Sequence, residues 1–142
     1  MTYLPSQRII ARSLAILFCA LILACGQKPE KAIDAALDNR VNGLKNKDIN
    51  LYMSAISSDY NDGKNTYATL KETAERHFLL FEKIDFQVKE RSLYLNPAKD
   101  EATVVQNYYL SFTLPSGTKG GKADERLVLR KQKDGWKIIG GL

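Results

Sequence analysis

Few side chains in this sequence have the types and spacing that catalysis or metal binding requires. Asp59–Gly63 is similar to a calcium-binding loop, but it is one residue short and lacks the distant glutamate, so it predicts a turn. Gly117–Ala123 is similar to a phosphate-binding loop, but it lacks one residue between the glycines. Ala123 also stands where a hydroxyl would bind magnesium, so this segment predicts a hairpin loop. The sequence has no Gly-x-Ser-x-Gly motif for a serine nucleophile.

One cysteine stands where its surroundings suggest a chemical role. Cys25 directly follows Ala24, at the end of an uninterrupted apolar run from Leu14 to Leu23. Two arginines precede the run, so the segment has the charge, the apolar stretch and the small residue of an export signal. The uncharged stretch Ser13–Gln27 is shorter than the about 20 apolar residues that span a bilayer. It therefore favours an export signal over a transmembrane anchor.

The four residues that end at this cysteine resemble the processing site of bacterial lipoproteins; they are Ile22, Leu23, Ala24 and Cys25. Leu23 departs mildly from the smaller or branched residue that is usual at this position. The alternative is an ordinary signal peptide with a different cleavage site. The resemblance implies removal of residues 1–24, acylation of Cys25 (for example by palmitate) and a short tether over 25–29. It also implies an anchor on the periplasmic face of the outer membrane, because Gly26 rather than Asp follows the cysteine.

This processing would leave the mature domain, residues 30–142, without a thiol, because Cys19 lies in the removed segment. His77 is the only histidine, so neither a zinc site nor any other metal or cofactor is expected. The chain carries 21 Lys and Arg against 16 Asp and Glu. This balance is mildly basic and gives no reason to expect nucleic-acid binding. A basic cluster near the last hairpin could meet anionic lipid or an acidic partner, although a solvated face explains it as well.

The first half of the domain predicts three helices. Apolar residues recur at three- and four-residue steps over Glu30–Lys45, namely at Ile33, Ala36, Leu37, Val41 and Leu44. Asp48 can cap a short second helix that ends at Ser54 or Ala55. A third helix is expected over Thr66–Glu82, with an inward stripe of Tyr67, Leu70, Ala74, His77, Phe78 and Phe81.

The second half changes to the period of two that is typical of strands. A strand with a bulge is expected over Ile84–Leu95, then a hairpin loop over Asn96–Asp100 and a long strand over Ala102–Leu114. Pro115–Gly121 predicts a mobile Gly-rich loop.

The last hairpin is expected to turn at Asp134–Gly135 and to set Lys133 opposite Trp136 and Lys131 opposite Ile138. In that register Leu129 faces Gly140, and the apolar residues Leu127, Leu129, Trp136 and Ile138 fall on one side.

Three helices followed by a four-strand meander indicate an α+β fold with the helices on one face of a curved antiparallel sheet. This order, with the local stretches Asp48–Tyr60 and Asp134–Ile139, resembles the nuclear transport factor 2-like superfamily, which includes SnoaL-like and ketosteroid isomerase-like proteins. The resemblance covers about Glu30–Leu142 and implies a cone whose sheet wraps a helix and leaves a pocket. A cystatin-like fold is the runner-up.

Seven residues are candidates for lining such a pocket: Tyr52, Tyr67, His77, Phe81, Gln106, Tyr108 and Trp136. Gln106 is polar on the apolar face of the longest strand, and a buried amide needs a ligand, a backbone group or water as its partner. His77 is singled out because histidine, as a residue type, titrates near neutral pH. The aromatic residues suit a core or a pocket mouth equally well.

The resemblance brings no catalytic residue with it. Ketosteroid isomerase-like relatives use a carboxylate base with a neutral acid or tyrosine, but the first-helix tyrosine has no counterpart on the face of Ile33, Leu37, Val41 and Leu44. The His/Asp pairing of SnoaL-like cyclases likewise finds no pair of positions here.

We therefore expect a non-catalytic lipoprotein that binds a small apolar ligand or an envelope protein, with a homodimer through the sheet as a further possibility. The alternative is an isomerase, cyclase or hydrolase that uses acid–base chemistry in the pocket. A third hypothesis is a structural subunit whose pocket is filled by its own side chains.

Overall fold

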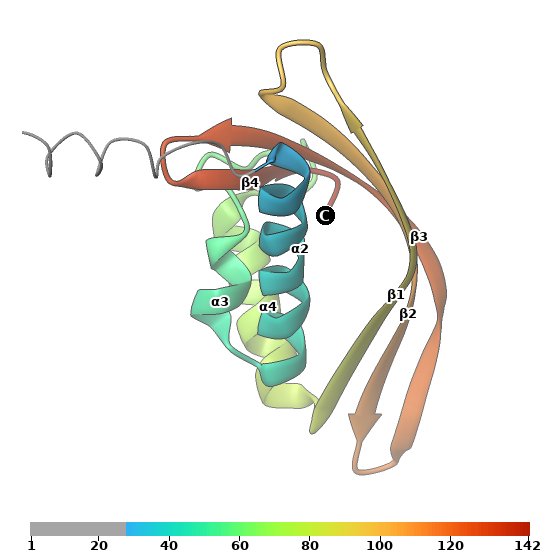
Figure 1. The fold of residues 1–142 in the computed structure, drawn as a ribbon. Coiled ribbons are helices and arrows are strands. Elements are labelled where there is room, and N and C mark those ends of the chain that lie inside the picture. The colour runs from blue at the N-terminus through green and yellow to red at the C-terminus, as the bar shows by residue number, and fades with distance from the viewer. Residues whose placement is uncertain (1–27) are drawn as a thin grey trace, which may run out of the picture.

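The computed structural model describes residues 28–142. The expected signal segment 1–24, Cys25 and the start of the tether lie outside the described residues. The described chain forms three helices and one four-stranded antiparallel sheet, in which neighbouring strands are also neighbours in sequence. Figure 1 shows the helices lying within the curve of the sheet. The expected α+β arrangement is therefore confirmed.

Each helix begins and ends at residues whose chemistry explains the boundary. Helix α2 (Pro29–Asn46) begins with a proline and ends where Lys47 adopts a left-handed conformation and donates to the last carbonyls. Helix α3 (Ile49–Ser54) is capped by Asp48, whose carboxylate accepts from the Leu51 amide at 3.0 Å. Helix α4 (Tyr67–Leu80) begins after Thr66 with a capping box: the Thr66 hydroxyl accepts from the Thr69 amide, and the Thr69 hydroxyl accepts from the Thr66 amide. All three predicted helices are confirmed, with ends within two residues of those expected.

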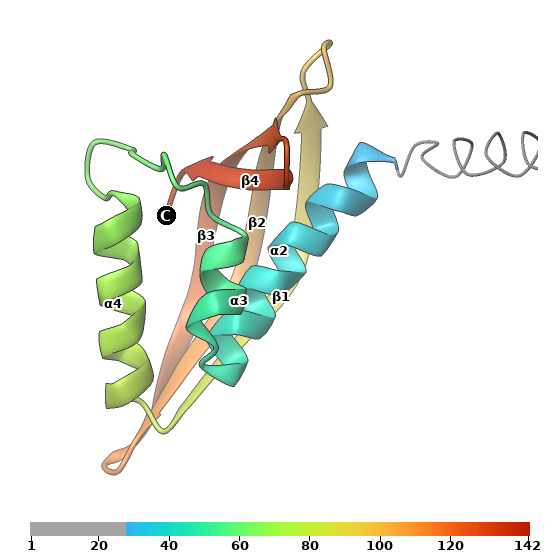
Figure 2. The ribbon, with the colours of Figure 1, turned by 90° about the vertical axis from the view of Figure 1, so that its left-hand side faces the viewer.

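The four strands are β1 (Lys83–Leu95), β2 (Glu101–Leu114), β3 (Gly117–Gln132) and β4 (Gly135–Gly140). The predicted bulge in the first strand lies between Val88 and Glu90. Alternate residues of β2 point towards the helices, so Ala102, Val104 and Gln106 are buried. Figure 2 shows α2 and α3 crossing one part of this concave face, while α4 runs along its other side.

The prediction of a loop over Pro115–Gly121 is wrong. Only Pro115 and Ser116 form the turn, and Gly117 already pairs with Leu114 at the start of β3. The glycines belong to the strand because β3 lies close to β2 at this point. A Cβ on Gly120 would lie 2.7 Å from the Leu110 carbonyl oxygen, a contact that side chains essentially never make.

The register expected for the last hairpin is also wrong, by two residues. Lys133 and Asp134 form the turn, so Lys131 pairs with Trp136 and Leu129 pairs with Ile138. A shift of two keeps every side chain on its face. The prediction that Leu127, Leu129, Trp136 and Ile138 share one side is therefore confirmed, and all four are buried.

The core lies between the helices and the half of the sheet near β4. Its buried residues are Ile33, Ala36, Leu37, Tyr52, Met53, Ala55, Ile56, Tyr60, Leu70, Ala74, Ala102, Val104, Leu127, Leu129, Trp136 and Ile138. The segment after α3 joins the sheet directly, since the Ser57 amide donates to the Ile138 carbonyl at 2.9 Å. Within residues 28–142, no helix has both the length and the apolar character needed to cross a membrane.

Tyr60 ties the last residue of the chain to the turn after α3. Its hydroxyl donates to Asp62 at 2.8 Å and accepts from the Leu142 amide at 2.8 Å. Burial raises the pKa of Tyr60 to about 12. The unfolded chain releases this proton near pH 10, about the ordinary value for tyrosine. The folded state holds the proton more tightly, so this contribution is complete below that pH and is lost as the pH rises towards 12.

We expect Tyr60→Phe to be less stable at neutral pH, by about 1 kcal/mol for the lost hydrogen bonds. We also expect it to lose less of its remaining stability between pH 10 and 12 than the parent protein does. Urea unfolding across this alkaline range measures both effects. An equal loss of stability in the two proteins would contradict the assignment.

Candidate functional site

A buried ion pair lies at the centre of the concave face. Arg40 of α2 donates through Nη1 and Nη2 to the two carboxylate oxygens of Glu125 on β3, at 2.7 and 3.0 Å. The two side chains are only 7% and 9% exposed. A bidentate pair of this kind is geometrically well defined, and each buried charge depends on the other for its counter-charge.

Two more residues extend the ion pair into a network. Gln106 lies opposite Glu125 in the sheet and donates to it at 2.6 Å, while its carbonyl oxygen accepts from Arg91 at 2.9 Å. Arg91 also donates to Asp34 at 2.9 Å and lies 3.7 Å from Asp38. Each guanidinium of the network thus faces a carboxylate, and both ends of the Gln106 amide have protein partners.

One donor of this network lacks a partner. Within residues 28–142, Nε of Arg40 is the buried side-chain nitrogen or oxygen that makes no hydrogen bond. Native structures leave few such groups unpaired, so an orphaned buried donor calls for an explanation. The nearest candidate acceptor is the Tyr52 hydroxyl, since both a hydrogen bond from Arg40 and the Arg40 charge act to lower the pKa of Tyr52 against the effect of burial. At Tyr108 only the charge of Arg40 acts in this direction.

Two aromatic stacks stand on the same face beyond the ion pair. Phe86 of β1 stacks on Tyr108 of β2 with ring centroids 4.4 Å apart, and the Arg40 guanidinium lies 5.3 Å from the Phe86 centroid. Phe81, directly after α4, stacks on Phe112 at 4.4 Å. His77 extends this second stack, 5.4 Å from Phe81.

Between the two stacks the concave face is hollowed rather than filled. The hollow has a volume of about 330 Å³ and is mainly apolar. It is lined by Tyr108, Leu110, Phe112, Lys119, Gly120, Gly121, Lys122 and Ala123. Residues 117–124 are all exposed, so no helix covers this part of β3. We call this feature the concave hollow.

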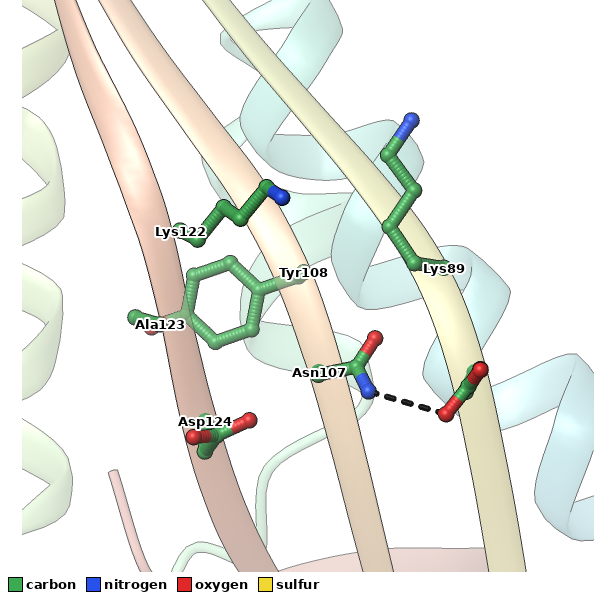
Figure 3. Close-up of a pocket in the computed structure, with 7 residues that line it drawn as sticks. Lys89, Asn107, Tyr108, Lys122, Ala123 and Asp124 are labelled. Carbon is green, nitrogen blue, oxygen red and sulfur yellow. Dashed lines mark hydrogen bonds between the residues drawn. The ribbon is translucent and has the colours of Figure 1, made fainter.

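A second hollow of about 430 Å³ lies at the bulge of β1, on the face of the sheet that points away from the helices. Figure 3 shows its side chains on the strands, with the helices behind them. Its lining is largely charged or polar and includes Lys89, Asn107, Lys122 and Asp124. The Asn107 amide donates to Glu90 at 3.1 Å. It is the larger of the two, but Tyr108 and Ala123 are the only residues of its lining that are neither charged nor amides.

Burial and the ion pair set the protonation states around Arg40. Burial by itself would lower the pKa of Arg40, but the Glu125 carboxylate outweighs it and raises the pKa. Burial also raises the pKa of Tyr52 and of Tyr108, and the Arg40 charge only partly opposes this. At neutral pH the site therefore holds a charged guanidinium beside two protonated phenols.

The structure brings some of the predicted pocket residues together and separates others. Tyr52, Gln106 and Tyr108 surround the ion pair, and His77 and Phe81 form the second aromatic stack. Tyr67 lies elsewhere, in a polar hollow of about 270 Å³ beside Gln132 and Lys137, and Trp136 belongs to the core.

Sequence reasoning missed the two charged residues at the centre of the site. Arg40 follows Leu37 by three residues and precedes Leu44 by four, so it occupies the inward stripe of the first helix. Glu125 precedes Leu127 and Leu129 at steps of two, on the inward face of β3. A charge at an apolar position of the pattern was the available signal in both cases.

The buried carboxylate of the site is fully engaged, because both oxygens of Glu125 already accept hydrogen bonds. The ring of His77 packs against the rings of Phe81 and Phe112. Over residues 28–142, no group of three or more His, Cys, Asp or Glu side chains is placed to hold a metal ion. What the geometry does offer is an open, mainly apolar hollow on the same face of the sheet as the buried ion pair.

Solved structures identify the fold. The chain is similar to the Kfla4162 protein from Kribbella flavida, with a TM-score of 0.70 and 11% identity over 79% of this chain and 86% of that one. It is similar to a nuclear transport factor 2-like superfamily protein from Salmonella enterica, with a TM-score of 0.69 and 11% identity over 78% and 86%. A candidate dehydratase of this family from Streptomyces avermitilis gives 0.68 and 14% over 79% and 92%.

The fold is therefore that of the nuclear transport factor 2-like proteins. No protein-family model and no curated protein matches the sequence. Because these identities are low, the similarity establishes the architecture and leaves the ligand and the chemistry to be argued from the site.

Proposed function

We propose that this protein is an envelope lipoprotein whose domain binds a small apolar molecule in the concave hollow without transforming it. The observation that carries this proposal is an open, mainly apolar hollow on the same face of the sheet as Glu125, whose two carboxylate oxygens are held by Arg40 and Gln106. Ligand pockets typically combine apolar walls with a few polar groups. A general base, by contrast, needs a free oxygen or nitrogen within reach of the proton that it removes.

A blocking substitution tests ligand binding. Ala123 is exposed and lines the concave hollow, so Ala123→Trp fills the hollow without disturbing the core. We expect the parent domain to co-purify with a defined small molecule, identified by native mass spectrometry, and Ala123→Trp to lose most of it. Asp124→Trp is the matched control, because it places the same bulk on the opposite face of β3. Retention of the molecule by Ala123→Trp would argue against the hollow as its site.

An acid–base enzyme is the alternative, since one of the structural neighbours is a candidate dehydratase. That activity would require Glu125 to leave its ion pair. A Glu125→Gln variant that keeps the bound molecule but stops its conversion would favour the enzyme over the binding protein.

Lipid attachment at Cys25 is the second part of the proposal and rests on the sequence resemblance alone. We expect Cys25→Ala to lose incorporation of a labelled fatty acid and to leave the membrane fraction, or to remain uncleaved. Cys19→Ala is the control and should behave like the parent, because Cys19 lies within the segment that processing removes. Undiminished fatty-acid labelling of Cys25→Ala would exclude this anchor.

The partner that we propose for the domain is a second copy of the same chain. A second copy could pair through the sheet face that points away from the helices, where Val105 and Tyr94 are exposed. Measurement of the molar mass in solution, with Val105→Lys as the disrupting variant, tests this pairing.

A further inference from the structure

We propose that the end of the domain around the start of α2 contacts anionic lipid headgroups and thereby sets the orientation of the domain on its membrane. Five lysines form this surface, and we call them the anchor-side lysines: Lys28, Lys31, Lys99, Lys131 and Lys133. The inference rests on the lipid attachment at Cys25 in the proposed function. Three features carry it: the position of the lysines, their charge and the short reach of the tether.

Three separate segments bring the anchor-side lysines to one end of the molecule. The start of α2 carries two of them, the loop between β1 and β2 carries Lys99, and the last hairpin carries the other two. The Lys131 amide donates to the Asp100 carbonyl at 2.8 Å, which joins the last hairpin to that loop. Figures 1 and 2 both show the start of α2, the β1–β2 loop and the β3–β4 turn at the same end. All five lysines are exposed.

The concave hollow lies towards the opposite end of the sheet. Phe112 in its wall pairs with Lys119 next to the β2–β3 turn. Figures 1 and 2 show this turn at the end of the molecule away from the start of α2. Contact between the anchor-side lysines and lipid therefore leaves the hollow facing away from the membrane, where a ligand can enter it.

The anchor-side lysines are not neutralised by the protein. Within residues 28–142, none of them takes part in an ion pair. Other cations near this end do have partners, since Arg130 lies 2.6 Å from Glu101 and Lys137 lies 3.1 Å from Asp134. A cation that already has a partner gains less from a lipid headgroup, so the five lysines are the charges that a membrane would attract.

Their charge exceeds that of the carboxylates beside them. Among the described residues around the start of α2 and the β1–β2 loop, two carboxylates stand outside any ion pair, Glu30 and Asp100. Five lysines against two carboxylates leave a surplus of three positive charges. Each basic residue within a Debye length of an anionic membrane contributes about 1 kcal/mol, which is about fivefold in affinity.

The tether holds this end of the domain close to the membrane. Lys28 follows Cys25 by three positions, and three residues of extended chain reach at most about 11 Å. This reach is comparable with the Debye length of about 8 Å at physiological salt. An acyl group on Cys25 therefore keeps the start of α2 within range of the headgroups, and no such constraint acts on the β2–β3 turn.

Fluorescence quenching on the full, acylated chain tests the contact. Processing removes Cys19 and acylates Cys25, so an introduced cysteine is the only free thiol for a fluorophore. Ala98→Cys labels the β1–β2 loop and Ser116→Cys labels the β2–β3 turn, and both positions are exposed. The vesicles contain phosphatidylcholine alone or equal parts of phosphatidylcholine and phosphatidylglycerol, with a nitroxide-headgroup lipid as the quencher. On the anionic vesicles we expect stronger quenching at position 98 than at position 116, and a fall to the neutral-vesicle level at about 1 M salt.

Paired substitutions assign the effect to the named lysines. Lys131→Gln/Lys133→Gln removes two anchor-side charges, so the ratio of docked to undocked protein on anionic vesicles should fall about 25-fold. Lys83→Gln/Lys119→Gln is the matched control, because it removes the same charge at the opposite end of the sheet and should leave the quenching unchanged. All four lysines are exposed, so neither double variant disturbs the core.

The outcomes separate this inference from the lipid attachment itself. Flotation with vesicles of phosphatidylcholine alone depends on the acyl group, so a chain that fails to float would overturn the anchor and the inference with it. A chain that floats but is quenched equally on both kinds of vesicle would overturn the lipid contact alone, and would leave an acidic protein as the occupant of this surface. Equal effects of the two double variants would overturn the assignment to the anchor-side lysines.

Discussion

Replacement of Arg40 by methionine is expected to lower the free energy of unfolding by about 3–5 kcal/mol, the range found when one partner of a buried ion pair is removed. The substitution preserves most of the side-chain volume but leaves the Glu125 carboxylate 9% exposed, with Gln106 as its remaining hydrogen-bond donor. A buried charge without a counter-charge must either pay its desolvation cost or take up a proton. Urea unfolding at neutral pH measures the loss, and acidification should relieve part of it.

Two companion proteins make this measurement specific to the buried pair. The double variant Arg40→Met/Glu125→Met removes both charges and should recover most of the loss, apart from about 1 kcal/mol for the acceptor that Gln106 loses. Arg130→Met breaks the ion pair with Glu101, whose side chains are 55% and 40% exposed, and should cost less than about 1 kcal/mol. If Arg40→Met were no more harmful than Arg130→Met, the buried pair would not be an essential part of the fold.

The architecture could be predicted because its signals are local. The caps at Asp48 and Thr66 and the changing apolar period lie within short windows of sequence, and they placed all three helices and the four strands in order. The alternation of apolar and polar residues alone predicted which side chains of each strand point to the core. For this reason the last hairpin kept its buried side even though its predicted register was wrong.

The centre of the site could not be predicted in the same way, because it depends on contacts between distant segments. Arg40 and Glu125 lie 85 positions apart in the sequence, and neither has a local feature that names the other as its partner. The pairing of β2 with β3 likewise determined that Gly120 and Gly121 lie in a strand. Their composition alone is typical of a loop. Tertiary context overrode the local preference at both places.

The same dependence on distant contacts can be tested where α2 crosses α3. Gly43 is buried on α2, and a Cβ at this position would lie 2.3 Å from the Tyr52 backbone nitrogen and 2.6 Å from its Cα. Backbone atoms cannot rotate away from such a contact, so α3 must shift. Replacing glycine by alanine ordinarily favours a helix by about 1 kcal/mol. Here we expect Gly43→Ala to destabilise the domain instead, by about 2–3 kcal/mol, because the overpacking exceeds that gain.

Asn42→Ala is the matched control, since Asn42 is the exposed neighbour on the same helix and should become slightly more stable on substitution. Chemical unfolding of the two variants gives the difference directly, and equal stability would show that α3 yields at no cost. The crossing also positions the site, because α3 carries Tyr52 beside Arg40.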